Sequence, residues 1–417
     1  MRTFEATCKI VTPLFMGGAS QQAELRTQSI NGVLRWWFRV AGGSLEDEKR
    51  IFGWAGETSN QGIVRIFVKN FDSLQKNKFS KEFDDKGRVR QDRGINYLGF
   101  SLDQRFNINQ TNRIQREYLK ENQTFDLKIS FHPKATDDDV KKFFCALWLA
   151  FNLGNFGSRA RRGFGSIKIE EIKEKGSPIT NNCYGLNFVP NGDLENWITD
   201  NLKKIIKDFI KPNERQDIPY LFKNFEIYQI QKDNVQKNNF NALKMWIEEV
   251  QNGRQGNYLK NSWSGNSINN WFELLDFMGF LLMAYRSYRN PDYNVAKNIL
   301  LGGQVNDPTF ERAIFGLPLN FYFSSINKGN MVHLKLGNET LRRASPLMIK
   351  IIQTGTKQDE ISYEGLFIIM KSTFMPANAR LMFSNKIVNL PNNIWQTLDD
   401  FISSLENKKL IRRIYKC

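Results

Sequence analysis

The stretch that decides the fold is G-N-F-G-S-R-A-R-R-G-F-G, at residues 154–165. It follows an apolar segment at about 137–153, which predicts a buried helix, and precedes S-I-K-I-E-E-I at 166–172, which predicts a strand. Glycines on both sides of three arginines let the backbone take positive φ and approach a ligand closely. Three arginines within four residues cannot all point into a core. The pattern therefore predicts a basic binding loop between a helix and a strand, with a solvated basic turn as the open alternative.

The segments before this loop extend the pattern toward the N-terminus. Alternating polar and apolar residues predict strands at 2–11 and 125–131, and an apolar run predicts another at 62–68. A helix is expected at about 33–41. Together with the helix and strand that flank the loop, the first half has the order strand, helix, strand, strand, helix, strand. This is the β-α-β-β-α-β order of a ferredoxin-like fold.

The second half repeats a short part of this pattern. A helix predicted at about 270–289 is followed by I-F-G at 314–316, as the helix at about 33–41 is followed by I-F-G at 51–53. An apolar strand is expected after each tripeptide. The repetition favours a duplicated unit, although chance recurrence of a tripeptide explains it equally well.

The predicted fold class is therefore α+β, with two ferredoxin-like (RRM-like) domains in tandem. The length of 417 residues favours two or three domains. A polar segment with scattered prolines at 176–215 suggests a linker. We expect an N-terminal domain over 1–175, which holds the glycine-rich loop, and a C-terminal domain with helical insertions over 176–417.

The charge of the chain limits its partners. The formal net charge is +16, which indicates an anionic partner such as nucleic acid, a membrane surface or an acidic protein. The longest apolar runs, from Phe143 and from Leu274, are shorter than the roughly 18–20 residues of a spanning helix, and no signal peptide is apparent. The four cysteines form no C-x-x-C pair, so neither a zinc site nor disulfides are expected. We expect a cytoplasmic protein without a metal or cofactor.

A second basic candidate is the helix within S-I-N-G-V-L-R-W-W-F-R-V at 29–40. Arg35 and Arg39 are four residues apart and share one face, which could extend a track for a phosphate backbone. The alternative is that these arginines pair with an acid such as Glu46 or Glu48.

The sequence gives little support for catalysis. A metal-free ribonuclease often uses histidine as its general acid or base, and the two histidines, His132 and His333, lie in no cluster. No convergent set of carboxylates suggests two-metal chemistry. We therefore nominate no catalytic residue and expect a protein that is not an enzyme, although a Tyr, Ser or Lys mechanism stays open.

Several motifs together resemble the RAMP superfamily of CRISPR proteins, and more narrowly the first RAMP subunit of the type III-B (Cmr) RNA-targeting effector complex. The resemblance covers most of residues 1–170 and thins to isolated motifs afterwards. The motifs are T-P-L-F-M-G-G at 12–18, E-L-R-T-Q-S-I-N-G-V-L-R-W-W-F-R at 24–39, R-I-F-G at 50–53, N-Y-L-G-F at 96–100, G-S-R-A-R-R-G-F-G-S at 157–166 and R-R-A-S-P-L at 342–347.

This resemblance implies tandem ferredoxin-like domains in a subunit that binds guide or target single-stranded RNA near the 3′ end of the guide, beside other Cmr subunits and without cleaving RNA. The glycine-rich loop is the RNA-contacting element of such proteins and corresponds here to residues 157–165. No such loop occurs in S-T-F-M-P-A-N-A-R-L-M-F-S at 372–384, so second-domain contacts would come from Arg342, Arg343 or Arg380. The residues that we predict to bind RNA are Arg26, Arg35, Arg39, Gly157, Ser158, Arg159, Arg161, Arg162, Gly163, Phe164, Gly165, Arg342 and Arg343.

Two other functions remain open from the sequence. One is a metal-independent endoribonuclease of the same superfamily that processes guide RNA. The other is a basic protein–protein scaffold whose arginines meet an acidic partner. In the RNA-binding hypothesis Phe164 either stacks on a base or packs within the protein.

Overall fold

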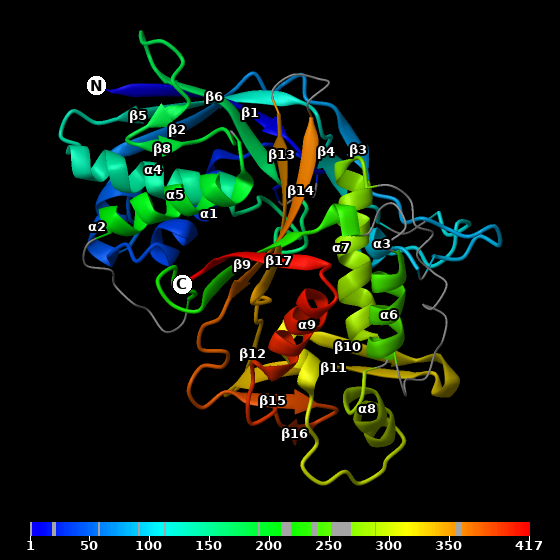
Figure 1. Ribbon diagram of the computed structural model, residues 1–417. Coiled ribbons are helices and arrows are strands. Elements are labelled where there is room, and N and C mark those ends of the chain that lie inside the picture. The colour runs from blue at the N-terminus through cyan, green and yellow to red at the C-terminus, as the bar shows by residue number, and fades with distance from the viewer. Residues whose placement is uncertain are drawn as a thin grey trace.

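The protein is an α+β molecule built from antiparallel sheets, as its computed structural model shows (Figure 1). The structure describes residues 2–18, 22–56, 59–90, 92–111, 114–190, 192–209, 218–234, 240–251, 268–287, 289–355 and 361–417. No helix in these ranges is both long and apolar enough to cross a membrane.

The first four-stranded sheet lies in the N-terminal half, in the order β2-β5-β1-β6. Its pairings are antiparallel, with Phe4 of β1 opposite Ile129 on one side and Glu174 on the other. The six predicted strands and helices are present in the predicted order, with further short elements between them. Its members are β1 (Thr3–Ile10), α1 (Thr27–Val40), β2 (Val64–Lys69), β5 (Thr124–Phe131), α4 (Asp137–Asn152) and β6 (Ile167–Glu174).

The helices of this half form because their apolar residues gather on the faces that meet the sheet. α4 begins with a capping box, in which Thr136 and Asp139 satisfy each other's backbone amides. Trp37 of α1 and Trp148 of α4 are fully buried in the core between helices and sheet. α1 starts six residues earlier than the predicted start at about residue 33, and α2 (Leu45–Phe52), capped by Ser44, was not predicted.

The second four-stranded sheet lies in the C-terminal half, in the order β13-β14-β9-β17. Numbered along the chain, both four-stranded sheets place their strands in the order second, third, first, fourth. α7 follows the first strand and α9 precedes the last, as α1 and α4 do in the first half. The elements are β9 (Phe225–Ile230), α6 (Phe240–Gln251), α7 (Trp271–Arg286), β13 (Leu347–Thr354), β14 (Ser362–Met370), α9 (Gln396–Asn407) and β17 (Ile411–Lys416).

A third sheet is inserted within the second half and lies at the bottom of Figure 1. The repeated I-F-G ends a helical turn in both halves, with φ of 86° at Gly53 and 114° at Gly316. The strands after the two tripeptides are not equivalent, since β2 belongs to a four-stranded sheet and β10 to the inserted one. The inserted elements are α8 (Asp292–Leu300), η3 (Glu311–Phe315), β10 (Leu319–Phe323), η4 (Ser324–Ile326), β11 (Lys328–Leu336), β12 (Glu339–Leu341), β15 (Arg380–Phe383) and β16 (Lys386–Val388).

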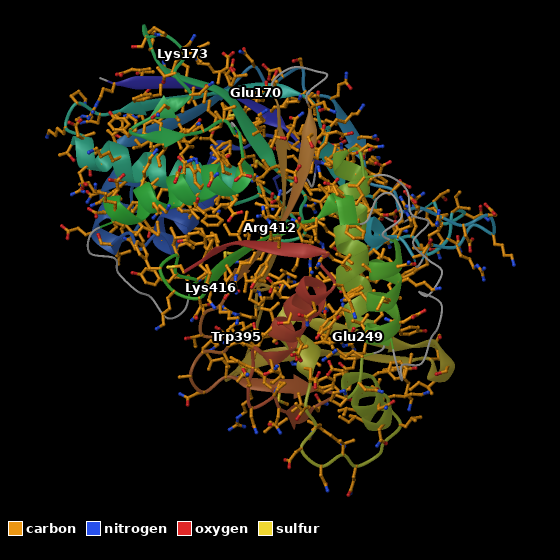
Figure 2. The ribbon with its side chains drawn as sticks, viewed as in Figure 1. Glu170, Lys173, Glu249, Trp395, Arg412 and Lys416 are labelled. Carbon is orange, nitrogen blue, oxygen red and sulfur yellow. The ribbon has the colours of Figure 1, made fainter. Side chains whose placement is uncertain are left out.

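Smaller elements fill the remaining connections. Of the segment predicted as a linker, the part before residue 209 forms β7, β8 and α5. Trp197 of α5 packs on Trp148 with ring centroids 5.2 Å apart. Glu195 of α5 pairs at 2.8 Å with Arg412 of β17, which is labelled in Figure 2. These elements are β3 (Lys76–Lys78), α3 (Gly94–Leu98), β4 (Glu117–Leu119), β7 (Asn182–Cys183), β8 (Leu186–Asn187), α5 (Leu194–Asp208) and η1 (Lys232–Asn234).

The two halves meet where β13 runs beside the glycine-rich loop. Arg162 and Ile349 form a parallel backbone bridge, and the amine of Lys350 donates 2.7 Å hydrogen bonds to the carbonyl oxygens of Phe151 and Gly154. β13 of the C-terminal half thus holds the end of α4. This junction places the basic loop between both halves of the molecule.

Candidate functional site

The glycine-rich loop is held rigidly by hydrogen bonds to the segment after β1. The hydroxyl of Thr12 donates to the carbonyl of Gly163 at 2.8 Å, and the amide of Ser158 donates to the carbonyl of Phe15 at 2.7 Å. Gly157 and Gly165 have φ of 80° and 74°. A Cβ at Gly165 would lie 1.9 Å from the Phe156 oxygen, so only glycine fits there. The predicted positive φ is confirmed at both glycines. The close contact at Gly165 is with the protein's own backbone, so close approach to a ligand stays a prediction.

The side chains of the three loop arginines point toward different neighbours. Arg159, itself at φ 61°, donates from Nε to the hydroxyl of Ser101 at 3.1 Å. Arg161 donates to the carbonyl oxygen of Ser345 at 2.5 Å, and its guanidinium lies 5.1 Å from the ring centre of Trp36. Nη1 of Arg162 is buried without a hydrogen-bond partner among the described residues. The loop thus contacts Ser101 on one side and Ser345, just before β13, on the other.

These arginines lie in a groove of about 990 Å³ between the two halves, which we call the arginine groove. Its lining comes from the glycine-rich loop, α3 and the residues after it, the end of α7, η3 and the segment before β13. None of the described lining residues is acidic. The arginines that line it are Arg116, Arg159, Arg161, Arg162, Arg286, Arg312, Arg342 and Arg343.

Burial makes this concentration of positive charge unfavourable in the absence of an anion. Burial, with the neighbouring positive charge of Arg343 as a smaller cause, lowers the pKa of Arg161 to about 10. Burial also lowers the pKa of Arg162 to about 10. Arg312 pairs with the fully buried Asp292 at 3.1 Å. A polyanion in the groove would therefore offset both the desolvation of the buried guanidinium groups and their mutual repulsion.

Sequence reasoning found part of this groove. The predicted Ser158 and the five predicted arginines of the loop and of residues 342–343 all line it. It missed Arg116, Arg286 and Arg312, which come from separate segments. One available signal was Arg286, the basic residue that ends the largely apolar α7. Its guanidinium donates to the hydroxyl of Tyr97 at 2.6 Å and thereby fixes an aromatic ring at the groove.

The predicted arginines of the first helix lie elsewhere. Arg35 pairs with Glu48 at 2.9 Å and Arg39 with the same carboxylate at 3.6 Å, which is the alternative that the sequence left open. Arg26 pairs with Glu24 at 3.2 Å. None of these three arginines lines the groove. Their contact with RNA stays a prediction, and the geometry does not favour it.

The prediction that Phe164 contacts RNA needs a correction. Its side chain is fully buried and packs edge-on against Phe15 and Phe79, with ring centroids 5.4 and 5.9 Å away. A ring enclosed in this way cannot stack on a base. Its neighbours Gly163 and Gly165 are buried too, on the side of the loop that faces the core. Phe164 therefore anchors the loop in the core, which is the second of the two roles considered for it.

The two histidines lie on different elements. His132 follows β5, where its ring accepts a hydrogen bond from the amide of Lys134 at 3.2 Å, and His333 lies on β11 of the inserted sheet. Neither lines the arginine groove. In the described part of the chain, no three His, Cys, Asp or Glu side chains gather as a metal site would require.

Comparisons with known proteins bear on the family. The model of the RAMP superfamily matches residues 7–168. The CRISPR system Cmr subunit Cmr1-2 of Pyrococcus furiosus is 35% identical over 182 residues, which are 39% of this chain and 93% of the relative. The chain belongs to the Cmr1 family of the RAMP superfamily. Subunit Cmr1-1 of the same organism is 26% identical over 392 residues, which are 91% of this chain and 89% of that relative.

A solved structure shares the fold of this Cmr1 family member. The apo crystal structure of Cmr1 from Pyrococcus furiosus superposes with a TM-score of 0.53 at 21% identity, and the match covers 100% of this chain and 99% of the other. The resemblance expected from the motifs is confirmed. The N-terminal match includes the whole glycine-rich loop, so the loop belongs to the region by which the superfamily is defined.

Proposed function

We propose that this Cmr1 family member is a non-catalytic, RNA-binding subunit of a type III-B CRISPR (Cmr) ribonucleoprotein in the cytoplasm. In this proposal the arginine groove holds single-stranded guide or target RNA near the 3′ end of the guide. The two four-stranded units act as tandem ferredoxin-like domains that form the groove between them. The relatives' names as Cmr subunits support the assignment to such a complex.

The observation that carries the proposal is the excess of arginine in one groove. Eight arginines line it, and no acidic side chain does among the described lining residues. Guanidinium groups bind phosphate oxygens bidentately and also stack on bases. The groove is about 990 Å³ and open along the junction, which suits a chain of phosphates better than one small anion.

The arrangement also favours low sequence specificity. Arginine contacts to a phosphate backbone fix the position of a strand but carry no base information. Phe100, exposed at 54%, and the ring of Tyr97 lie at the same groove and offer stacking surfaces that accept any base. A subunit that must accept many guide sequences needs this kind of surface.

The absence of cleavage is part of the proposal and rests on the chemistry at the groove. Neither histidine lies there, and the lining residues supply positive charge and hydroxyl groups rather than a paired general acid and base. Bound RNA should therefore stay intact.

The test is RNA binding by the purified protein across a salt series. It compares the wild type with a variant in which Arg159, Arg161 and Arg162 are changed to alanine, using single-stranded RNA, duplex RNA and single-stranded DNA. Each lost phosphate contact should reduce the slope of log affinity against log salt by about 0.7 on a single strand, so the triple variant should lose about 2 units.

A matched control removes the same charge elsewhere. Arg65, Lys78 and Lys335 are exposed and lie outside the groove, so their joint change to alanine should leave most of the salt slope unchanged. Equal weakening in both variants would contradict the groove as the site. RNA cut by the wild type would contradict the non-catalytic role, and binding indifferent to nucleic-acid type and length would favour the scaffold.

A further inference from the structure

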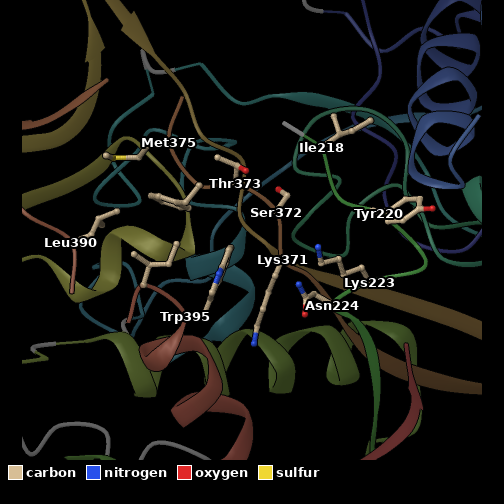
Figure 3. A pocket seen from close by; sticks show the side chains of 12 residues that line it. Ile218, Tyr220, Lys223, Asn224, Lys371, Ser372, Thr373, Met375, Leu390 and Trp395 are labelled. Atoms are coloured by element: carbon tan, nitrogen blue, oxygen red, sulfur yellow. The ribbon is translucent and has the colours of Figure 1, made fainter. Parts of the chain in front are cut away.

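A second cavity, of about 580 Å³, opens beside the arginine groove. It lies between the start of β9, the residues that follow β14 and the start of α9 (Figure 3). We call it the Trp395 pocket. The residues that characterise its lining are Tyr220, Asn224, Ser372, Thr373, Leu390 and Trp395.

Arg343 joins the pocket to the groove. This arginine lines the groove, and its guanidinium donates a 2.6 Å hydrogen bond to the hydroxyl of Ser372, which lines the pocket. The same guanidinium lies 5.6 Å from the ring centre of Phe374, another pocket residue. A phosphate backbone that passes Arg343 therefore reaches the mouth of the pocket directly.

The two walls of the pocket differ in chemistry, as Figure 3 shows. Trp395, Leu390 and Met375 form an apolar wall on one side, and Tyr220 and Asn224 stand opposite with Lys223 beside them. The residues 371–373 cross between them. A nucleobase has the matching shape, with a flat apolar face for an indole ring and polar edges for hydrogen bonds.

Trp395 is held in place before any ligand arrives. Its ring meets that of Phe374 at 89° with centroids 6.4 Å apart. The amine of Lys371 lies 6.0 Å from the indole centre on one side and pairs with Asp399 at 2.5 Å. A ring fixed in this way loses little conformational entropy when a base stacks on it.

The polar side of the pocket offers hydrogen-bonding groups that are free. Within the described residues, the carboxamide of Asn224 and the hydroxyl of Thr373 make no hydrogen bond, and both residues are exposed. An amide and a hydroxyl each donate and accept, so they can match the edges of different bases. Among the described residues that line the pocket none is acidic, and the nearby carboxylate of Asp399 is paired with Lys371.

We infer that the Trp395 pocket receives one base of the RNA strand that lies in the arginine groove, with the base stacked on Trp395 and its edge toward Asn224 and Thr373. This inference rests on the proposed RNA binding and adds to it a specific base-accepting site. It follows from the shared Arg343, the apolar wall and the free polar groups together.

The experiment compares a 12-nucleotide oligouridine with a 12-mer of the same ribose–phosphate backbone that carries no bases. Trp395→Ala should bind the oligouridine roughly 10-fold more weakly than the wild type does, the order expected from the loss of one stacked base, and should bind the abasic strand unchanged. Trp395→Phe retains a ring and should recover most of the affinity. Trp54→Ala removes an exposed tryptophan that lies outside both cavities and should change neither affinity.

The inference would be overturned by an unchanged affinity of Trp395→Ala for oligouridine, or by equal losses on both strands that persist in the Phe variant. The wild type supplies a measurement that needs no variant, because 4-thiouridine at one position of the RNA should crosslink to the pocket residues 371–375 or 395. Crosslinks found only elsewhere would also overturn it. The triple loop variant separates the two proposals: it should weaken both strands, and if it weakens neither, the arginine groove itself fails as the RNA site.

Discussion

The side-chain amide of Asn155 donates a 2.8 Å hydrogen bond to the carbonyl oxygen of Ile349, 194 positions later in the chain. The same amide donates to the carbonyl of Ala160 at 2.6 Å, and its oxygen accepts from the hydroxyl of Ser166 at 2.6 Å. One buried carboxamide thus ties the glycine-rich loop to itself, to Ser166 just before β6 and to the edge strand β13 of the other half. The shape of the loop and the arrangement of the two halves are therefore coupled.

Changing Asn155 to alanine should lower the free energy of unfolding by about 1–3 kcal/mol, because it leaves buried polar groups without partners. RNA affinity should fall as well, since the loop loses its fixed shape. Urea unfolding and the RNA-binding assay give the two readouts. Asn392→Ala, at an exposed position, is the control and should change neither. Unchanged stability in the Asn155 variant would show that the coupling is weak.

Single arginine variants should distinguish the groove from the first helix. Arg342 is exposed and lines the groove, so Arg342→Ala should reduce the salt slope of RNA binding by about 0.7 without loss of stability. Arg35 lies outside the groove and pairs with Glu48, so Arg35→Ala should destabilise the fold and leave the salt slope unchanged. A reduced salt slope in Arg35→Ala and an unchanged slope in Arg342→Ala would instead place the RNA contact on α1.

Local pattern was sufficient for the first unit of the fold. The alternation at residues 125–131 and the apolar run before Gly154 each predict one element, and β5 and α4 match them closely. The glycine positions of the loop were readable for the same reason, because positive φ is a local requirement. The second unit was harder, since an inserted sheet separates its first two strands and breaks the repeat.

The groove could be predicted only in part because it is a product of tertiary contacts. Arg286 and Arg312 come from elements more than 100 residues after the loop, and no spacing rule connects them to it. The role of Phe164 was decided by its burial, which the sequence did not reveal. Phe164 follows three arginines and a glycine in a loop that reads as exposed, yet its ring is enclosed by Phe15 and Phe79.

Phe164→Ala should lower the free energy of unfolding by about 3–5 kcal/mol, the usual result of deleting a buried aromatic ring. Phe164→Leu fills most of the volume and should bind RNA like the wild type, because the ring touches no ligand. Chemical unfolding and RNA binding of both variants check this. A folded leucine variant with a clear loss of affinity for oligouridine, but not for the abasic strand, would restore the stacking role.

The buried amine of Lys350 should make the free energy of unfolding depend on pH. Its amine is buried between the two halves, and burial lowers its pKa from the ordinary value to about 7. The unfolded chain, with an ordinary lysine pKa near 10.4, therefore binds more protons than the folded chain between about pH 7 and pH 10. Stability contributed by this group must rise with pH across that window, by at most about 1.4 kcal/mol per unit, and level off below pH 7.

Lys350→Met removes this titration, so the stability of the wild type relative to the variant should increase from pH 7 to pH 9.5. Subtraction of the two profiles cancels the other titrating groups, including the buried thiols of Cys8 and Cys145, whose pKa values are raised by burial. Urea unfolding at pH 6, 7, 8 and 9.5 measures both proteins. Lys335→Met, at an exposed position on β11, should follow the wild type. Parallel profiles for wild type and Lys350→Met would mean that the junction keeps its lysine charged, held by the carbonyl oxygens of Phe151 and Gly154 at the end of α4.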